Sequence, residues 1–286
     1  MFGFLNINKP KGLTSHDVVA KLRRITKVKQ IGHSGTLDPL AQGVLPIAIG
    51  KATRLIEYLS DEKAYIVCLK FGFVSDTYDT EGKIEEFSTE KVDKLLVENN
   101  LNEFVGNIEQ IPPAYSAVHY NGKRLYELAR EGIIPEDIPK RQVLVNSIKL
   151  LSFDDLNQTC ELEIDCSKGT YIRSIVHDLG QNLRVGAVMT DLIRINSSNF
   201  MLGNSIELSK LSNTNDVESV LINPLEVLLY SKVQLSDEDF SRVKNGIALN
   251  NPSYENGLKL ILEHNDKLVA FAKVQDGFIK MDKVFV

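Results

Sequence analysis

The sequence predicts a mixed α/β (α+β) fold, in which helices flank a largely antiparallel sheet and a small β-rich domain follows at the C-terminal end. Three observations predict it. The chain has 286 residues, enough for about two domains. Apolar residues make up 43% and charged residues 25%, so the chain can bury a core and is not disordered as a whole. Apolar residues alternate as in strands in some segments and recur at helical spacing in others, and these segments follow one another without an internal repeat.

The N-terminal part alternates between strand and helix. Its helix is supported by Thr14 as an N-cap, by Asp17 in the first turn and by apolar residues at helical spacing from Val18 to Ile25. The segment after it is rich in glycine, proline and small polar residues, which favours a loop. We expect a strand at 2–8, a helix from 14 to about 26, a loop at 32–43, a strand at 44–49 and a helix at 53–59.

The pattern is more broken in the next part of the chain. Thr89 can cap a helix in which Val92, Leu95 and Leu96 face inward, and Gly132 ends a shorter helix. We expect a strand at 65–73, a polar turn at 75–82, helices at 89–100 and 124–131, and an exposed loop at 132–141.

A strand pair is the clearest β signal. Cys160, Leu162, Ile164 and Cys166 fall on one face of the second strand, with polar residues on the other, as in a half-buried strand. Two of the three cysteines therefore belong to a core, and a disulfide scaffold or cysteine zinc site is disfavoured. We expect strands at 143–153 and 159–166, a helix at 171–182 and a strand at 185–196.

The polar stretch 209–219 predicts a separation between two units. Beyond it, a short helix at 235–244 precedes three strand-like segments, which suits a small barrel-like domain. We therefore expect domains at 1–225 and 230–286, with strands of the second domain at 257–263, 268–274 and 278–285.

Charge is unevenly distributed along the chain. Lys and Arg number 33 and Asp and Glu 38, a net charge of −5, which alone argues weakly against a nucleic-acid partner. Between Lys9 and Lys29, however, basic side chains outnumber the single acidic one, Asp17, by six. Such a local excess can contact phosphates, and it can equally be the solvated face of a helix.

Several classes of protein are disfavoured. The uncharged run 39–50 is too short to span a bilayer, and no basic-then-apolar N-terminal segment predicts secretion, so we expect a cytoplasmic protein. The spacing before Lys51 is wrong for a phosphate loop, and the histidines lack metal-ligand spacing, so we expect neither cofactor nor metal. Asp76, Asp79 and Glu81 lack the alternation of a calcium loop and predict a solvated turn.

The segment GHSGTLDP at 32–39 is the strongest candidate for chemistry. An aspartate before a proline is commonly a turn former, which is one interpretation of Asp38. In the other, the loop holds the Asp38 carboxylate and the His33 imidazole at a substrate cleft, where its glycines allow close backbone approach.

Five motifs stand out in order along the chain. They are NKPKG at 8–12 with Ser15, GHSGTLDPLAQGVLP at 32–46, KAY at 63–65, QIPPAYSAV and GKRLYELAREG at 110–118 and 122–132, and SKGTYIRS at 167–174. Together they resemble the TruB-type tRNA pseudouridine synthases. The resemblance spans about residues 5–200, and the remainder resembles the small PUA-like domain of bacterial members. Ser34 and Thr36 are mild departures from the family pattern.

The resemblance implies isomerisation of uridine to pseudouridine at position 55, in the T-loop of tRNA, by a monomer that needs no cofactor, metal or membrane. It implies that Asp38 is the catalytic carboxylate and that Arg173 is its ion-pair partner. It also implies that the target base flips out and stacks on Tyr65, whose hydroxyl can help remove a proton. The carboxylate could attack the sugar, attack the uracil ring or remove a ribose proton.

The resemblance further implies how RNA is held. His33 occupies space near the displaced base, Leu192 forms an apolar wall, and Tyr171 supports the pocket from below. An insertion at about 113–141 grips RNA and orders on binding it. Phosphate contacts are expected from the basic face of the first helix and from Lys9, Lys11, Lys123, Arg124 and Arg130.

Three alternatives stay open at this point. A relative that acts on ribosomal RNA inside a guide-RNA particle would share the catalytic motifs. A non-catalytic RNA-binding or RNA-folding factor would not need Asp38, Tyr65 and Arg173. A glycoside hydrolase would need a second carboxylate within reach of Asp38.

Overall fold

One large sheet, mixed but mostly antiparallel, organises the computed structural model, which describes residues 1–251 and 253–286. Over these residues ten strands join in the order β14-β1-β3-β12-β4-β11-β10-β7, with β2 beside β3 and β13 beside β12. Only the β1–β14 and β3–β12 pairs are parallel. The strands are β1 (Gly3–Lys9), β2 (Ile31–His33), β3 (Gln42–Ile49), β4 (Lys63–Phe71), β7 (Gly106–Gln110), β10 (Arg141–Asp154), β11 (Thr159–Cys166), β12 (Ala187–Ser197), β13 (Phe200–Met201) and β14 (Ile206–Glu207).

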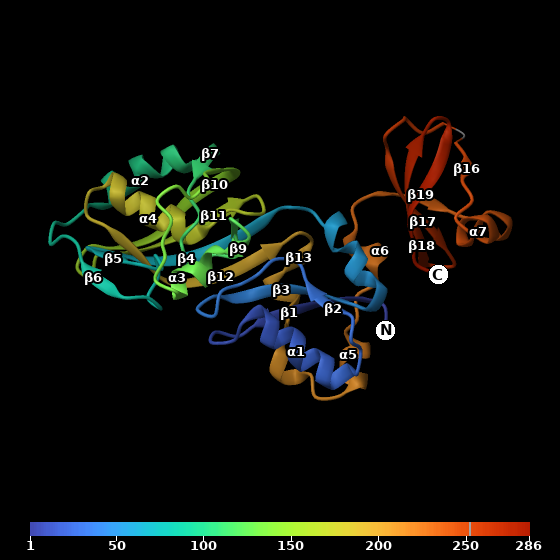
Figure 1. The fold of residues 1–286 in the computed structure, drawn as a ribbon, viewed down its shortest axis with the longest axis horizontal. Coiled ribbons are helices and arrows are strands. Elements are labelled where there is room, and N and C mark those ends of the chain that lie inside the picture. Colours follow the sequence, from blue (N-terminus) through green and yellow to red (C-terminus); the bar gives the residue numbers. More distant parts are fainter. Residues whose placement is uncertain (252) are drawn as a thin grey trace.

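Helices cover this sheet near its two ends, as Figure 1 shows. Helix α1 (Ser15–Thr26) lies below β1 and β3, whereas α2 (Lys94–Leu101) and α4 (Ile172–Asn182) lie together near β10 and β11. The principal core fills the space between the sheet and these helices. The predicted fold class, a largely antiparallel sheet flanked by helices, is confirmed.

Helix α1 follows its sequence signals closely. Thr14 and Asp17 form a reciprocal capping box, in which the Thr14 side chain accepts from the Asp17 backbone N–H and the Asp17 carboxylate accepts from the Thr14 N–H. Val18, Val19 and Leu22 are buried on the inner face. Likewise Cys160 and Cys166 are buried on β11, as the alternation predicted.

Two predicted helices differ in the structure. The segment expected at 53–59 is a 3₁₀ helix, η1 (Gly50–Tyr58). The helix expected at 89–100 is α2, which begins at Lys94 because Asp93, and not Thr89, caps it. The prediction that Leu95 and Leu96 face inward is wrong: these side chains are 65% and 43% exposed, since the Asp93 cap sets a register that buries other residues.

The predicted loop at 32–43 and the predicted separator at 209–219 are also corrected. Strand β2 extends to His33 and β3 begins at Gln42, which leaves a shorter loop at 34–41. The 209–219 stretch contains α5 (Thr214–Ser219) and belongs to the large unit, because the Thr214 hydroxyl donates to the Ile25 carbonyl of α1 at 3.2 Å.

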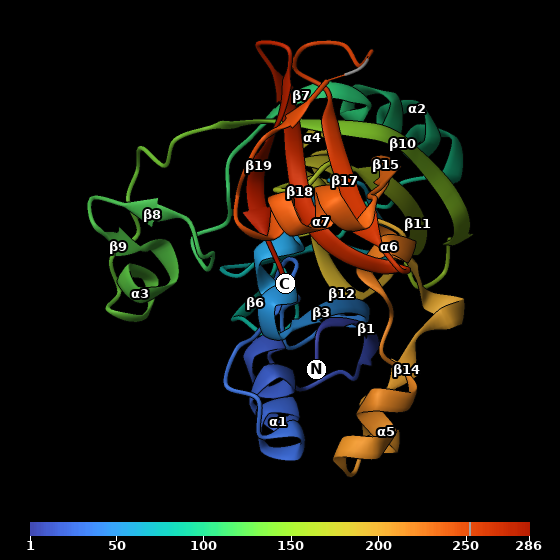
Figure 2. The ribbon, with the colours of Figure 1, turned by 90° about the vertical axis from the view of Figure 1, so that its right-hand side faces the viewer.

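The insertion projects from the main sheet, as Figure 2 shows. It contains a two-stranded hairpin, β8 (His119–Tyr120) and β9 (Lys123–Arg124), and a short helix, α3 (Leu125–Arg130). A second hairpin, β5 (Phe73–Ser75) with β6 (Ile84–Glu86), frames the turn at 76–83. The insertion therefore has local structure, although its ordering on RNA stays a prediction.

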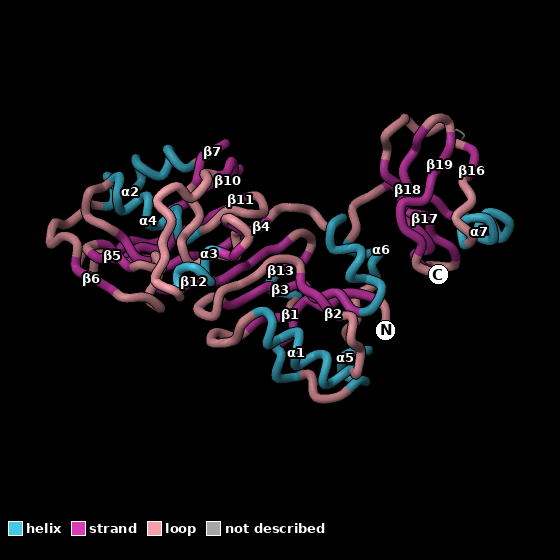
Figure 3. Tube along the Cα trace, in the orientation of Figure 1, coloured by secondary structure: helices cyan, strands magenta, loops and turns pink. Residues whose placement is uncertain are grey.

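The C-terminal part is mostly strand and lies apart from the large sheet (Figure 3). It docks onto η1, where the Tyr58 ring stacks on Phe271 at 3.7 Å and the Lys51 ammonium donates to the Phe285 carbonyl. We keep the division into 1–225 and 230–286 as a proposal. The elements are α6 (Pro224–Val227), β15 (Ser231–Gln234), α7 (Asp237–Lys244), β16 (Leu249–Asn250), β17 (Lys259–His264), β18 (Lys267–Gln275) and β19 (Phe278–Val284).

Among the described residues, no helix combines the length and the apolar character that a membrane crossing requires.

Candidate active site

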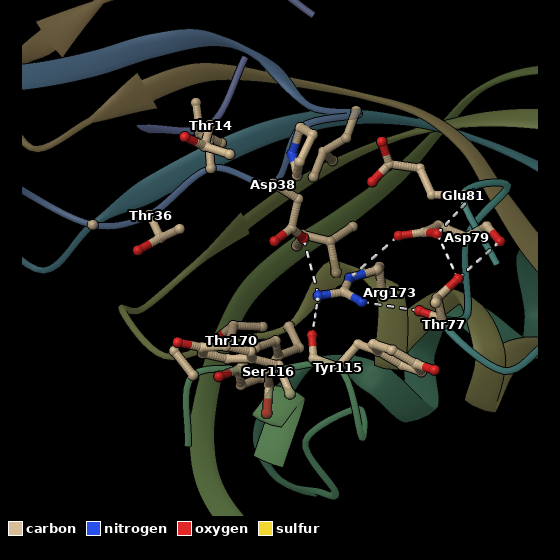
Figure 4. A pocket seen from close by; sticks show the side chains of 18 of the residues that line it. Thr14, Thr36, Asp38, Thr77, Asp79, Glu81, Tyr115, Ser116, Thr170 and Arg173 are labelled. Carbon is tan, nitrogen blue, oxygen red and sulfur yellow. Dashed lines mark hydrogen bonds and ion pairs between the residues drawn. The ribbon is translucent and has the colours of Figure 1, made fainter. Parts of the chain in front are cut away.

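A cavity of about 800 Å³ opens between the large sheet, the loop at 34–41 and the insertion. Figure 4 shows side chains from several distant segments converging on it. The loop contributes residues 35–39, the turn after β5 contributes Thr77, Asp79 and Glu81, and the start of α4 contributes Arg173. The predicted site residues Asp38, Tyr65, Arg124, Arg130, Tyr171, Arg173 and Leu192 all line this cavity.

Arg173 is the centre of the polar contacts. Its guanidinium Nη2 lies 3.0 Å from the Asp38 carboxylate, so the ion pair that the sequence analysis predicted is present. The Nε lies 3.7 Å from the Asp79 carboxylate. The guanidinium also donates to the backbone carbonyls of Thr77 at 2.9 Å and Tyr115 at 3.0 Å. Arg173 is only 5% exposed, so these contacts replace its hydration.

Asp38 is held by the backbone of its loop. The Ser15 hydroxyl donates to the Leu37 carbonyl at 3.0 Å and accepts from the Leu37 N–H at 2.8 Å, which ties the loop to the start of α1. The Gly12 N–H donates to the Pro39 carbonyl at 2.8 Å on the other side. The Asp38 side chain stays 36% exposed. One edge of the carboxylate thus meets Arg173, and the remainder is accessible from the cavity.

Asp79 is a site residue that the sequence analysis missed. The expected solvated turn is wrong for it, because Asp79 is 2% exposed. Its carboxylate accepts from the Thr77 hydroxyl at 2.6 Å and from the Glu81 N–H at 3.0 Å, beside Arg173. The turn carries three acidic residues close together, which was the available signal, but burial by other segments cannot be read from it. We call Asp38, Arg173 and Asp79 the carboxylate–arginine network.

Glu81 lines the same cavity. Burial, together with the nearby carboxylates of Asp79 and Asp38, raises the pKa of the Glu81 carboxyl above its ordinary value. Three carboxyl groups are therefore close together on this side of the cavity, and the raised pKa favours the neutral form of Glu81.

An aromatic stack holds the turn against α4. The rings of Tyr78 and His177 are parallel within 12° and 3.9 Å apart, and His177 lies one helical turn beyond Arg173. Tyr78 has a φ of +66°, an unusual conformation for a bulky side chain. Hydrogen bonds with Met189 on β12 fix the backbone on both sides of Asp79. Burial lowers the pKa of His177, which favours the neutral ring.

Tyr65 lines the cavity from β4 and is 7% exposed. Burial raises the pKa of its phenol, which favours the protonated hydroxyl. Leu192, on the neighbouring strand β12, adds the apolar surface that the sequence analysis expected. These two side chains supply an aromatic ring and an aliphatic wall beside the network.

Tyr171 lies immediately before α4, and its backbone is fixed by Gln110. The Tyr171 N–H donates to the Gln110 side-chain oxygen at 2.7 Å, and the Gln110 amide donates to the Tyr171 carbonyl at 2.9 Å. Gln110 is 2% exposed. This reciprocal pair anchors the N-terminal end of the helix that carries Arg173, a role that the sequence analysis did not assign.

The predicted basic contacts divide into two groups. Arg124 and Arg130 line the cavity from the insertion, with the Arg130 guanidinium over the Tyr126 ring at 5.3 Å. Lys123 instead pairs with Glu131 at 3.0 Å outside the cavity lining. Lys11 pairs with Asp191 at 3.2 Å, and its side chain is 48% exposed.

The prediction that Lys9 contacts phosphate is wrong. Lys9 is fully buried on β1, and its ammonium donates to the carbonyls of Leu13 at 2.6 Å and Pro10 at 3.0 Å. Burial lowers its pKa to about 8. The Lys9 side chain therefore holds the turn before α1 and offers no surface to RNA.

His33 does not line the cavity. It ends β2, directly before the loop, and its Nδ1 is buried without a hydrogen-bond partner among the described residues. Burial lowers its pKa, so the ring is favoured as neutral. Within the part of the chain that the structure describes, no cluster of three or more His, Cys, Asp or Glu residues is arranged to hold a metal ion.

This arrangement defines a class of protein. An accessible carboxylate held by a buried guanidinium, in a cavity that an aromatic ring and exposed arginines also line, is typical of an enzyme active site. Residues 23–172 match the model of the TruB family pseudouridylate synthase N-terminal domain. The chain belongs to this family.

Relatives match over nearly the whole chain. The chain is 45% identical to a tRNA pseudouridine synthase B of Synechocystis sp., over 91% of this chain and 90% of the relative. It is 42% identical to one from Lactobacillus gasseri, over 96% and 94%. It is 38% identical to one from Clostridium kluyveri, over 100% of both chains.

Solved structures show the same fold. A chain from an H/ACA RNP bound to a substrate RNA containing 2'-deoxyuridine matches with a TM-score of 0.75 and 25% identity, covering 100% of this chain and 85% of that chain. A chain from a Cbf5-Nop10-Gar1 complex matches with a TM-score of 0.73 and 27% identity, with the same two coverages.

Proposed function

We propose that this protein isomerises uridine to pseudouridine in tRNA, at position 55 of the T-loop. The observation that carries the proposal is the 3.0 Å pair between Arg173 and the accessible Asp38 carboxylate, in a chain of this family. The relatives named tRNA pseudouridine synthase B support tRNA as the substrate. The domain division, the site residues and their roles below are part of the same proposal.

The reaction rearranges one nucleotide. The bond between ribose C1′ and uracil N1 breaks, a bond between C1′ and C5 of the same uracil forms, C5 loses a proton and N1 gains one. No electron is exchanged with a second molecule. Asp38 serves as the reacting carboxylate. Three routes are possible: it attacks the sugar carbon, it attacks the uracil ring, or it removes a ribose proton. Each route needs it ionised and oriented, which the planar fork of Arg173 provides.

The cavity walls suit a base that has left its stack. Flipping a base costs a few kcal/mol, about 1–3 kcal/mol of which stacking on an aromatic side chain can return. Tyr65 offers the ring, and Leu192 the apolar wall beside it. Because burial keeps the Tyr65 phenol protonated, its hydroxyl acts first as a hydrogen-bond donor to the base.

The insertion and the basic helix face complete the proposal as RNA contacts. Arg124 and Arg130 reach the cavity and meet backbone phosphates near the target, while Lys11 and Lys123 contribute at its margin. The predicted place of His33 beside the displaced base is not part of this proposal, because His33 ends β2 outside the cavity lining, whereas Tyr171 supports the pocket floor. We infer further that the protein acts as a cytoplasmic monomer without metal or cofactor.

A guide-RNA-dependent enzyme is the second candidate, because the chains from the H/ACA RNP and from the Cbf5-Nop10-Gar1 complex share the fold. Identity to the tRNA enzymes is 38–45%, against 25–27% to those chains, which favours a stand-alone tRNA enzyme. A glycoside hydrolase is disfavoured by the family, although Asp79 and Glu81 lie near Asp38. Asp79 is engaged by Arg173 and buried, so it is not free to act on a second face of a sugar.

One experiment tests the proposal. Purified protein is incubated with unmodified tRNA that carries tritium at C5 of uracil, and released tritium is measured and mapped. We expect stoichiometric release from the T-loop uridine and from a bare T-arm hairpin. Release that required a guide RNA and protein partners would support the second candidate, and RNA binding without release would support a non-catalytic factor.

A further inference from the structure

A second concentration of positive charge lies in the cavity, and the reaction does not use it. Lys63 on β4 and Arg194 on β12 both line the cavity. Lys63 precedes Tyr65 by two residues on one strand, so both side chains point to the same face of the sheet. The large sheet therefore contributes two cations to the cavity, in addition to Arg173 on α4 and to Arg124 and Arg130 of the insertion.

The two cations converge above one glycine. A Cβ atom on Gly35 would lie 3.4 Å from the Lys63 Nζ and 3.7 Å from the Arg194 Nη1. Gly35 has a φ of +98°, which glycine adopts without strain, and it is exposed in the cavity wall. The absence of a side chain at Gly35 leaves room there for a group of a ligand beside the half-buried Lys63 ammonium, with Arg194, which is 1% exposed, directly behind it.

Neither cation forms an ion pair with a carboxylate of the described residues. Arg194 donates to the carbonyls of Val44 at 2.7 Å and Gly35 at 3.2 Å, which are neutral acceptors. In the part of the chain that the structure describes, no carboxylate oxygen lies within 4.0 Å of the Lys63 ammonium or the Arg194 guanidinium. Arg173 differs, because it contacts two carboxylates.

The surroundings of Lys63 make it costly to keep two cations side by side without an anion. Burial and the neighbouring Arg194 lower the pKa of Lys63 to about 8. The other titratable groups near it are Cys166 on β11, whose pKa burial raises to about 11, and the ion pair of Asp61 with Lys168 at 2.9 Å. A half-buried ammonium beside a buried guanidinium is unfavourable until an anion joins them.

We propose that Lys63, with the charge of the buried Arg194 behind it, forms a phosphate-binding subsite over Gly35 for the RNA backbone phosphodiester next to the target uridine. This inference rests on the proposed function. Gly35 lies three residues before Asp38, at most about 11 Å along an extended chain, so a phosphate held here belongs to the target nucleotide or its immediate neighbour. The subsite fixes the backbone while the base turns toward Asp38, and Lys63 acts as a point charge that needs no planar fork.

The test combines protein variants with neutralised phosphates. Wild type, Lys63→Gln and Lys63→Arg are compared on a T-arm hairpin and on hairpins in which a methylphosphonate replaces the phosphate 5′ or 3′ of the target uridine. Lys149→Gln is the control, since Lys149 is exposed, pairs with Glu163 and does not line the cavity. Dissociation constants, KM and kcat are measured, and thermal melting checks that each variant is folded.

We expect Lys63→Gln to weaken binding of the natural hairpin and raise KM by about tenfold, while Lys63→Arg and Lys149→Gln stay within about threefold of wild type. The slope of log affinity against log salt concentration should be shallower for Lys63→Gln than for wild type, by the amount that corresponds to about one phosphate contact. One of the two methylphosphonate hairpins should bind wild type about as weakly as the natural hairpin binds Lys63→Gln. On that hairpin, wild type and Lys63→Gln should have equal affinities. Wild-type affinity should also fall as the pH rises through about 8, and Lys63→Arg should lose this dependence.

The inference is overturned if Lys63→Gln binds the natural hairpin as wild type does, or if its penalty persists on both methylphosphonate hairpins. In the latter case Lys63 contacts the base or the sugar. Because binding is measured without turnover, a hairpin that binds through this phosphate but forms no pseudouridine would refute the proposed function and leave the subsite standing.

Discussion

The carboxylate–arginine network and the insertion line one cavity, yet they hold their charges in different ways. In the network, Arg173 is 5% exposed and contacts two carboxylates and two backbone carbonyls. In the insertion, Lys123 and Glu131 pair with about half of each side chain in solvent, and Ile133 and Ile134 are 51% and 57% exposed. A buried charge is costly to displace, whereas an exposed pair contributes little.

This contrast assigns different tasks to the two regions. The network is preorganised, because its members are fixed by contacts that exist without substrate. The insertion can rearrange around RNA at small energetic cost. We therefore expect changes in the network to lower kcat and changes in the insertion to raise KM.

The largest effect is expected from Asp38→Asn. It removes the reacting carboxylate and keeps the size of the side chain, so pseudouridine formation should fall by at least about 10³-fold. RNA binding should stay within about tenfold, or 1.4 kcal/mol, of wild type. Single-turnover tritium release and a dissociation constant measure the two quantities. Normal turnover would show that another residue is the reacting group.

Arg173→Lys tests the preorganisation of the network, because it keeps the positive charge and removes the planar guanidinium. A lysine ammonium has three donors and cannot reach Asp38, Asp79 and two carbonyls at once, so at least one of these acceptors loses its donor. We expect kcat to fall about 10²-fold with KM within about threefold. If kcat stayed near the wild-type value, orientation by the planar group would be unimportant.

In the insertion, the double change Arg124→Gln and Arg130→Gln should raise KM about tenfold and leave kcat nearly unchanged. The slope of log kcat/KM against log salt concentration should become shallower by the amount that corresponds to one to two phosphate contacts. Lys140→Gln is the matched control, because Lys140 pairs with Glu109 and does not line the cavity. A fall in kcat without a change in KM would break the proposed division of tasks.

The smallest effect is expected from His177→Ala, which removes the ring that stacks on Tyr78. An aromatic pair contributes about 0.5–1.5 kcal/mol, so we expect kcat to fall about threefold to tenfold as the turn that contacts Arg173 loosens. His177→Phe retains a ring and should restore kcat. Equal kcat for both variants would show that the stack does not position Arg173, whatever it does to the melting temperature.

Features that depend on neighbours along the chain could be predicted from the sequence alone. The capping box of Thr14 and Asp17 and the buried alternation of β11 both depend on contacts within a few residues or on one strand face. The family resemblance also allowed one long-range contact to be predicted, because the motifs around Asp38 and Arg173 predicted an ion pair between residues 135 positions apart. The fold class followed from the same patterns.

Tertiary structure alone decided which charged groups are buried. Lys9 resembles a surface lysine in the sequence, and Asp79 resembles part of a solvated turn, but strands and loops from elsewhere enclose both. Leu95 and Leu96 look like core residues, but the Asp93 cap turns them outward. Capping and alternation act over a few residues, whereas burial depends on segments that meet only after the chain has folded, so it is absent from any local pattern.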